Sequence, residues 1–121
     1  MEKNILVVDD SMFIYEELKY MLEDTPFQII GHAKSGEDAL DLYENLEPDL
    51  ITMDIVLPGM DGLETARAIL KDHPAAKIIM ISSLAYDDTI EEAQKIGTRG
   101  FIFKPSERDL LMDLLNDCFS E

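Results

Sequence analysis

The sequence predicts an α/β fold in which a doubly wound parallel sheet carries helices on both faces. Five short apolar segments alternate along the chain with five longer segments whose apolar residues recur at helical spacing. Such alternation favours parallel strands joined by right-handed crossovers. The segments 4–8, 50–53 and 77–81 lack polar alternation, which is typical of strands covered on both faces. The 121 residues match one domain, residues 1–121, with no spare linker.

The first strand is predicted at residues 4–8, and it ends at two carboxylates, Asp9 and Asp10. Ser11 is expected to cap the helix that follows, because its hydroxyl can accept a bond from a free backbone N–H of the first turn. Pro26 should end this segment, since proline cannot continue a helix.

The second and third strands are separated by a helix predicted at residues 36–46. The second strand, at 27–30, is less continuous and is expected near the edge of the sheet. The third, at 50–53, stops at Asp54, and a loop rich in proline and glycine follows. A charge is costly to bury unpaired, so Asp54 is expected where the strand leaves the core.

The second half of the chain repeats the pattern. A helix at 62–72 precedes the fourth strand, which ends at Ser82, and a helix at 87–96 should stop at Gly97. The fifth strand, at 101–103, ends at Lys104. Ser106 is expected to cap the last helix, whose apolar residues include Leu111, Leu114, Leu115 and Cys118.

Composition narrows the classes of function. The net charge is -16, with ten basic residues against 26 acidic ones. Affinity for nucleic acids rests on Lys and Arg that neutralise phosphates, so direct nucleic-acid binding is excluded. No apolar run is long enough for a membrane span, and no signal peptide is visible at the N-terminus. The one cysteine, Cys118, permits no internal disulfide. We therefore expect a soluble, cytoplasmic protein.

Five polar side chains follow four predicted strands: Asp9, Asp10, Asp54, Ser82 and Lys104. In open parallel sheets, ligands bind outside the carboxyl ends of the strands, so these side chains should meet there. Three clustered carboxylates repel unless one is protonated or a cation is shared, and Mg²⁺ favours such hard oxygen ligands. A carboxylate can itself attack phosphorus, with a lysine and a hydroxyl to hold the phosphoryl oxygens. The sequence thus predicts a phosphoryl-transfer site centred on Asp54.

These residues lie in motifs that resemble those of the receiver domains of bacterial two-component response regulators, of the chemotaxis-regulator type. The resemblance runs from about residue 3 to residue 115. It implies the flavodoxin-like strand order 2-1-3-4-5, for which a chemotaxis member of this family is a known example. Four motifs carry the resemblance, at residues 7–11 (VVDDS), 53–62 (MDIVLPGMDG), 81–83 (ISS) and 103–105 (FKP).

The resemblance also implies a role for each site residue. Asp54 would accept a phosphoryl group from a histidine kinase, a phosphotransfer protein or a small phosphodonor. Asp10, Asp54 and the backbone carbonyl of Val56 would bind Mg²⁺, with Asp9 reaching the ion through water. The protein would act as a signalling switch, not as an enzyme with substrate turnover beyond its own phosphotransfer and dephosphorylation.

The remaining implied roles concern the switch itself. Lys104 would pair with the phosphoryl oxygens, and its bond to Pro105 would be cis. Ser82 would move toward the phosphoryl group while Phe101 swings inward. The helix at 87–96, the fifth strand and the last helix would then change their surface and bind a downstream effector protein or output domain. We expect a monomer or a weak dimer.

The chain also departs from the family pattern. The switch hydroxyl is Ser82 where Thr is common, the switch aromatic is Phe101 where Tyr is common, and Ser106 replaces a frequent Phe. Val56 and Leu84 occupy the two positions that flank the attacking water in the family. Neither side chain can orient that water, so slow self-dephosphorylation is predicted.

Other functions remain open at this point. A Mg²⁺-dependent phosphatase with an aspartyl nucleophile would usually carry a second acid where this chain has Val56. A flavin-binding electron carrier would place its phosphate beside Asp9 and Asp10, which would repel it. A receiver used only as an unphosphorylated scaffold, or one cut from a longer DNA-binding regulator, would carry similar motifs. His32 and His73 have no partners at metal-ligand spacing and are expected as surface or loop residues.

Overall fold

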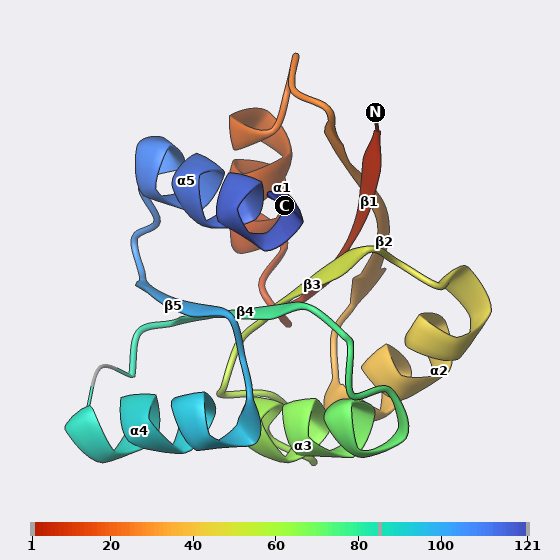
Figure 1. Cartoon of the computed structure of the whole chain (residues 1–121), viewed down its shortest axis with the longest axis vertical. Coiled ribbons are helices and arrows are strands. Elements are labelled where there is room, and N and C mark those ends of the chain that lie inside the picture. Colours follow the sequence, from red (N-terminus) through yellow and green to blue (C-terminus); the bar gives the residue numbers. More distant parts are fainter. Residues whose placement is uncertain (1, 85, 121) are drawn as a thin grey trace.

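A computed structural model describes residues 2–84 and 86–120 of the chain. Strands and helices alternate from β1 to α5, as Figure 1 shows. The elements are β1 (Lys3–Val8), α1 (Met12–Met21), β2 (Phe27–Ala33), α2 (Gly36–Leu46), β3 (Leu50–Met53), α3 (Gly62–Asp72), β4 (Ile78–Ser82), α4 (Asp87–Ile96), β5 (Gly100–Phe103) and α5 (Arg108–Phe119). In the part of the chain so described, no helix has the length and apolar character that crossing a membrane requires.

All the strand pairs are parallel, and the order across the sheet is β2-β1-β3-β4-β5. Both the doubly wound fold class and the strand order expected from the sequence are confirmed. The less continuous β2 lies at the edge of the sheet, as predicted.

The sheet separates two layers of helices (Figure 1). Alternate residues of β1 face opposite sides: Leu6 and Val8 pack in the core beneath α2, α3 and α4, whereas Ile5 and Val7 pack in the core beneath α1 and α5. All four side chains are essentially inaccessible to solvent. Burial on both faces explains why β1 shows no polar alternation.

Two predicted helix caps are confirmed, Ser11 at the start of α1 and Gly97 at the end of α4. The hydroxyl of Ser11 accepts a bond from Ile14 N at 3.3 Å at the start of α1. Gly97 ends α4 in the left-handed conformation, with φ 109°. Asp61, for which no cap was predicted, accepts a bond from Glu64 N at 2.9 Å at the start of α3.

The prediction that Ser106 caps the last helix is wrong. The N-cap of α5 is Glu107, whose backbone is extended and whose side chain makes no capping bond. Ser106 is buried one residue before the cap, so its hydroxyl lies outside the first turn of the helix. That hydroxyl has no hydrogen-bond partner among the residues that the structure describes. The bond between Lys104 and Pro105 is cis, as expected.

Two other boundaries differ from the predicted ones. Helix α1 ends at Met21, well before Pro26, with Leu22 as its C-cap, and the chain then passes through Asp24, which has φ 60°. Strand β2 continues through Ala33 instead of stopping at residue 30, and its ladder with β1 includes an irregularity between Ile5 and Leu6. The glycine at position 31 therefore interrupts the pattern of β2 without ending the strand.

Candidate functional site

The acidic site, defined here as Asp9, Asp10 and Asp54, lies at the carboxyl ends of β1 and β3. Backbone hydrogen bonds between neighbouring strands fix the positions of two of these residues: Asp54 N donates to Val8 O at 2.9 Å, and Asp9 N donates to Ala33 O at 3.0 Å. The side chains of Asp9 and Asp54 are buried, with 2% and 6% of each residue exposed. Asp10 is exposed. Two carboxylates thus face the interior of the site while the third stands at its rim.

Lys104 joins the two buried carboxylates. Its Nζ lies 2.8 Å from Asp9 Oδ2 and 3.1 Å from Asp54 Oδ2. The side chain of Lys104 is mostly buried, so these bonds form where screening by water is weak. The convergence of Asp9, Asp54 and Lys104 that the sequence predicted is therefore observed.

The other oxygen of each buried carboxylate is held by the backbone. Oδ1 of Asp9 accepts from Ser11 N at 2.9 Å, and Oδ1 of Asp54 accepts from Ile55 N at 2.8 Å. Each carboxylate is therefore fixed at both oxygens before any ligand arrives. Such preorganisation lowers the cost of holding a charged group in position.

The loop after Asp54 folds tightly against that residue. Gly62 N donates to Ile55 O at 2.7 Å, and a Cβ at Gly62 would lie 1.8 Å from Asp54 O. Gly59, in the same loop, has φ 72°, a conformation that favours glycine. Val56 also lies in this loop, with 57% of its surface exposed. The glycines of the motif thus permit the close return of the chain beneath Asp54.

Burial and charge shift two protonation equilibria in the site. Burial raises the pKa of Asp54 above its usual range, and the negative charge of Asp9 adds to this, although Lys104 opposes it. For Lys104, burial alone would lower the pKa, but the bonds and charges of Asp9 and Asp54 outweigh it and raise that pKa. The charged form of Lys104 is stabilised by two carboxylates, whereas Asp54 shares this one ammonium with Asp9. The site carries an excess of negative charge.

The chemistry of the donors fits a hard divalent cation. One carboxylate oxygen from each of Asp9, Asp10 and Asp54 lies within 4.8 Å of the others. Mg²⁺ binds carboxylate oxygens and usually keeps several water ligands. Asp10 is exposed, so this side of the site is open to water. The acidic site could therefore hold such an ion, as the sequence predicted. The role of the Val56 carbonyl as a ligand stays a prediction.

Ser82 ends β4, the strand next to β3, and Phe101 lies in β5. Ser82 is fully buried at the end of β4, and its Oγ accepts from Leu84 N at 3.2 Å. The carbonyl of Ser82 accepts from Lys104 N at 3.0 Å, which ties β4 to the segment that carries the lysine. Phe101 is half-buried and packs against the core beneath α2, α3 and α4. Their predicted movements stay predictions.

One neighbour of the site was misread in the sequence. His32 was expected on the surface or in a loop, but it belongs to β2 and pairs in register with Val7. Its Nε2 lies 2.7 Å from the carbonyl oxygen of Asp9, and its ring stacks on Tyr15 with centroids 4.4 Å apart. Extending the predicted second strand beyond residue 30 would have placed His32 beside the end of β1. His73 is partly exposed and contacts Glu44 on another helix, away from this site.

Known proteins resemble the chain over almost its full length. The family model for the response regulator receiver domain matches residues 5–116. The chain is 36% identical over 111 residues to the chemotaxis protein CheY of Listeria monocytogenes, covering 92% of this chain and 93% of that protein. CheY of Thermotoga maritima is 36% identical over 116 residues, covering 96% and 97%.

Solved structures agree with this assignment. A chain of the CheX-CheY-BeF3-Mg²⁺ complex from Borrelia burgdorferi superposes with a TM-score of 0.93 at 32% identity, covering 98% of this chain and 90% of that one. The response regulator domain of Thermotoga maritima CheB superposes with a TM-score of 0.87 at 32% identity, covering 100% and 99%. The fold, the acidic site and these similarities lead to one conclusion: the chain belongs to the family of response regulator receiver domains, with the CheY-like fold and a role in two-component signalling.

Proposed function

We propose that the protein is a phosphoacceptor switch in which Asp54 receives a phosphoryl group. The observation that carries this proposal is the shared contact of Lys104 Nζ with Asp9 and Asp54, at 2.8 and 3.1 Å. It places an ammonium next to the carboxylate oxygen that would carry phosphorus. Family membership supports the same reading, and so does the Borrelia complex, which contains BeF3 and Mg²⁺.

The transfer forms one bond and breaks one. An ionised oxygen of Asp54 attacks phosphorus in a phosphohistidine of a kinase or phosphotransfer protein, or in acetyl phosphate. The bond from phosphorus to the donor nitrogen or oxygen breaks, and the leaving group keeps the electron pair. A histidine donor then takes up a proton to become neutral imidazole, whereas acetyl phosphate releases acetate as the anion. Lys104, already 3.1 Å from Asp54 Oδ2, would then donate to a phosphoryl oxygen.

Mg²⁺ is the proposed cofactor. Asp9, Asp10 and Asp54 supply the oxygen donors at its site. When bound, the ion supplies charge neutralisation for the phosphoryl oxygens. The fixed carboxylates of Asp9 and Asp54 hold their positions through Ser11 N and Ile55 N, so little reorganisation is needed.

The switch would follow from the new charge. A phosphoryl group adds strong acceptors, as phosphorylation of other side chains does. Ser82 would exchange its bond with Leu84 N for one with the phosphoryl group, and Phe101 would fill the space that opens. Moving such an equilibrium from 1:99 to 99:1 needs about 5.5 kcal/mol of differential interaction. Hydrogen bonds to charged groups contribute roughly 1.5–3 kcal/mol each, so a few suffice.

The surface that changes is proposed to be α4, β5 and α5. Three large apolar side chains lie exposed along these elements: Tyr86 just before α4, Phe103 at the end of β5, and Leu110 in α5, at 66%, 49% and 45%. Such side chains suit a protein partner, here a downstream effector or an output domain. We propose a cytoplasmic protein without substrate turnover beyond its own phosphotransfer and dephosphorylation.

The receiver of a longer regulator is the alternative. The chain is 39% identical over 105 residues to a protein-glutamate methylesterase/protein-glutamine glutaminase of Halalkalibacterium halodurans but covers only 30% of it, whereas it covers 93% of Listeria CheY. Proteins similar to this chain therefore include one of about the same length and one that is much longer. The phosphoacceptor chemistry at Asp54 would be the same in either one.

Incubation with acetyl phosphate, with and without Mg²⁺, tests the proposal. Intact mass should show one added phosphoryl group on the wild type only when Mg²⁺ is present. Asp54→Asn should abolish the gain, while Asp41→Asn, which removes an exposed carboxylate on α2, should leave it unchanged. An adduct that persists in Asp54→Asn refutes the assignment of the acceptor.

A further inference from the structure

The imidazole of His32 holds the backbone between two residues of the acidic site. Its Nε2 lies 2.7 Å from the carbonyl oxygen of Asp9. A carbonyl oxygen only accepts hydrogen bonds, so Nε2 carries the hydrogen and donates the bond. The peptide unit that contains this carbonyl is planar and ends at the Cα of Asp10. A bond that fixes the Asp9 oxygen therefore also restrains the Cα from which the Asp10 side chain extends.

The three acids of the site are not held in the same way. The carboxylates of Asp9 and Asp54 are fixed by Lys104 and by backbone N–H groups. Asp10 is exposed at the rim of the site, and His32 bonds to the peptide just before it. Ordering an exposed side chain around a ligand costs conformational entropy, and a restrained backbone lowers that cost. The bond from His32 should therefore matter most for Asp10.

An irregularity in the pairing of β1 with β2 decides which face of the sheet His32 occupies. Between Ile5 and Leu6 the pairing advances by two residues of β2 instead of one. Beyond this point His32 pairs with Val7, which packs in the core beneath α1 and α5. A regular ladder would pair His32 with Val8, which packs on the opposite face. Bulges of this kind re-aim side chains, and this one directs His32 toward the layer of α1.

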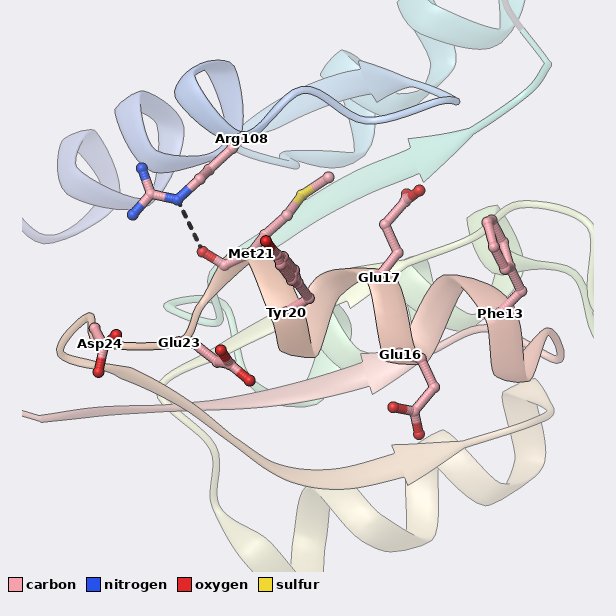
Figure 2. A pocket seen from close by; sticks show the side chains of 8 residues that line it. All are labelled: Phe13, Glu16, Glu17, Tyr20, Met21, Glu23, Asp24 and Arg108. Carbon is pink, nitrogen blue, oxygen red and sulfur yellow. Dashed lines mark hydrogen bonds between the residues drawn. The ribbon is translucent and has the colours of Figure 1, made fainter.

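Helix α1 provides the surface on which the imidazole rests. The ring of Tyr15 stacks on that of His32, with centroids 4.4 Å apart and an angle of 10° between the planes. The helix is itself fastened to α5, because Arg108 Nε donates to the carbonyl oxygen of Met21 at 3.2 Å, the bond drawn as a dashed line in Figure 2. The stack therefore orients the imidazole from a fixed element while Nε2 reaches the turn between β1 and α1.

We propose that His32 is a positioning residue that raises the affinity of the acidic site for Mg²⁺ by holding the peptide between Asp9 and Asp10. The inference rests on the proposed function, since it assumes that Mg²⁺ binds at this site. His32 would not contact the ion, because its Nε2 already donates to the backbone. Groups that orient the ligands of a metal typically contribute about ten- to a hundredfold in affinity. His32 acts through the main chain, so we expect the lower value.

NMR titration of the full chain with Mg²⁺ measures the dissociation constant in each variant. His32→Phe keeps an aromatic ring for Tyr15 but has no donor, and its dissociation constant should rise about tenfold. His32→Gln keeps an N–H donor near the position of Nε2 and should stay within about threefold of the wild type. His73→Phe is the matched control, because His73 also contacts a tyrosine ring and an acceptor, Tyr43 and Glu44, but away from the site. It should leave the dissociation constant unchanged.

The outcomes separate positioning from support of the fold. A dissociation constant for His32→Phe equal to that of the wild type overturns the proposal, even where the urea midpoint falls. An equal loss in His32→Gln overturns it too, because the donor would then not be the cause. His32→Leu also lacks a donor and replaces His32→Phe if that variant does not fold.

A double variant tests whether His32 acts through Asp10. In the Asp10→Asn background, His32→Phe should cause little further loss of Mg²⁺ affinity, and a full second loss would contradict this route. The result also distinguishes the two proposals. A wild type that binds no Mg²⁺ refutes the proposed cofactor and this inference with it. A wild type that binds Mg²⁺ as tightly as His32→Phe refutes the inference alone.

Discussion

The Nζ atom of Lys104 lies 2.8 Å from Asp9 Oδ2, although 95 positions separate the two residues in the chain. The same ammonium lies 3.1 Å from Asp54 Oδ2. One cation is therefore divided between two buried carboxylates, and a third carboxylate, Asp10, stands beside them. The three carboxylates therefore exceed the positive charge that Lys104 supplies, and a divalent cation could balance them.

Asp54→Asn should stabilise the fold at neutral pH in the absence of Mg²⁺, because burial of the Asp54 charge costs more than its interaction with Lys104 returns. The pKa of Asp54 is raised in the folded state. As pH rises from below the usual carboxyl range, the unfolded chain loses its proton first, and the wild type loses stability. The difference should grow with pH and become constant above the raised pKa. Urea denaturation at several pH values measures it, and a constant difference across that range would contradict the argument.

Mg²⁺ should stabilise the wild type against unfolding. At a concentration a hundred times its dissociation constant, a ligand that binds only the folded state contributes about 2.7 kcal/mol. Asp10→Asn removes one exposed, proposed ligand and should shrink this gain, with little effect on stability without the ion. Asp38→Asn, an exposed acid of α2, is the control and should retain the full gain. Thermal melts with and without Mg²⁺ provide the comparison.

Gly62→Ala should destabilise the protein by about 1–3 kcal/mol or more, the range for overpacked sites. The new Cβ would lie 1.8 Å from the backbone oxygen of Asp54, which can move only if the site moves with it. Gly31→Ala is the matched control, because there the nearest atom, at 2.7 Å, is the end of the Leu46 side chain, which can turn away. Equal urea midpoints for the two variants would contradict the proposed constraint.

Phosphorylated protein should decay slowly, because Val56 and Leu84 offer no polar group to orient the attacking water. Val56 is 57% exposed, so a polar replacement there should be tolerated. Val56→Asn should raise the rate of phosphate release severalfold, while Val56→Ile should not. Release of phosphate after removal of the donor is the measurement. A half-life of seconds in the wild type would contradict the prediction.

The sequence predicted the fold and the partners of Lys104 for the same physical reason. Apolar runs without polar alternation mark strands buried on both faces, and the charged residues that stop them must lie at the edge of the core. Asp9, Asp54 and Lys104 each follow such a run, so a parallel sheet brings them together. The strand order itself was inferred from the resemblance and not from the pattern.

What the sequence did not predict depends on side-chain contacts between elements. Ser106 resembles a cap in the sequence, but packing buries it one residue before the helix. His32 lies beyond residue 30, where the second strand was predicted to end, and pairing with β1 continues that strand through Ala33. Arg108 of α5 donates to the carbonyl oxygen of Met21 in α1, and no pattern within either helix specifies that contact.

Chemical mapping of the phosphorylated residue tests the central claim most directly. Borohydride reduces an acyl phosphate and leaves ordinary carboxylates intact, so digestion and peptide mass spectrometry would identify the acceptor after treatment with acetyl phosphate and Mg²⁺. Our account predicts reduction at Asp54 alone, and none when Mg²⁺ is left out. Reduction at Asp9, at Asp10 or at any acid outside the site would contradict it.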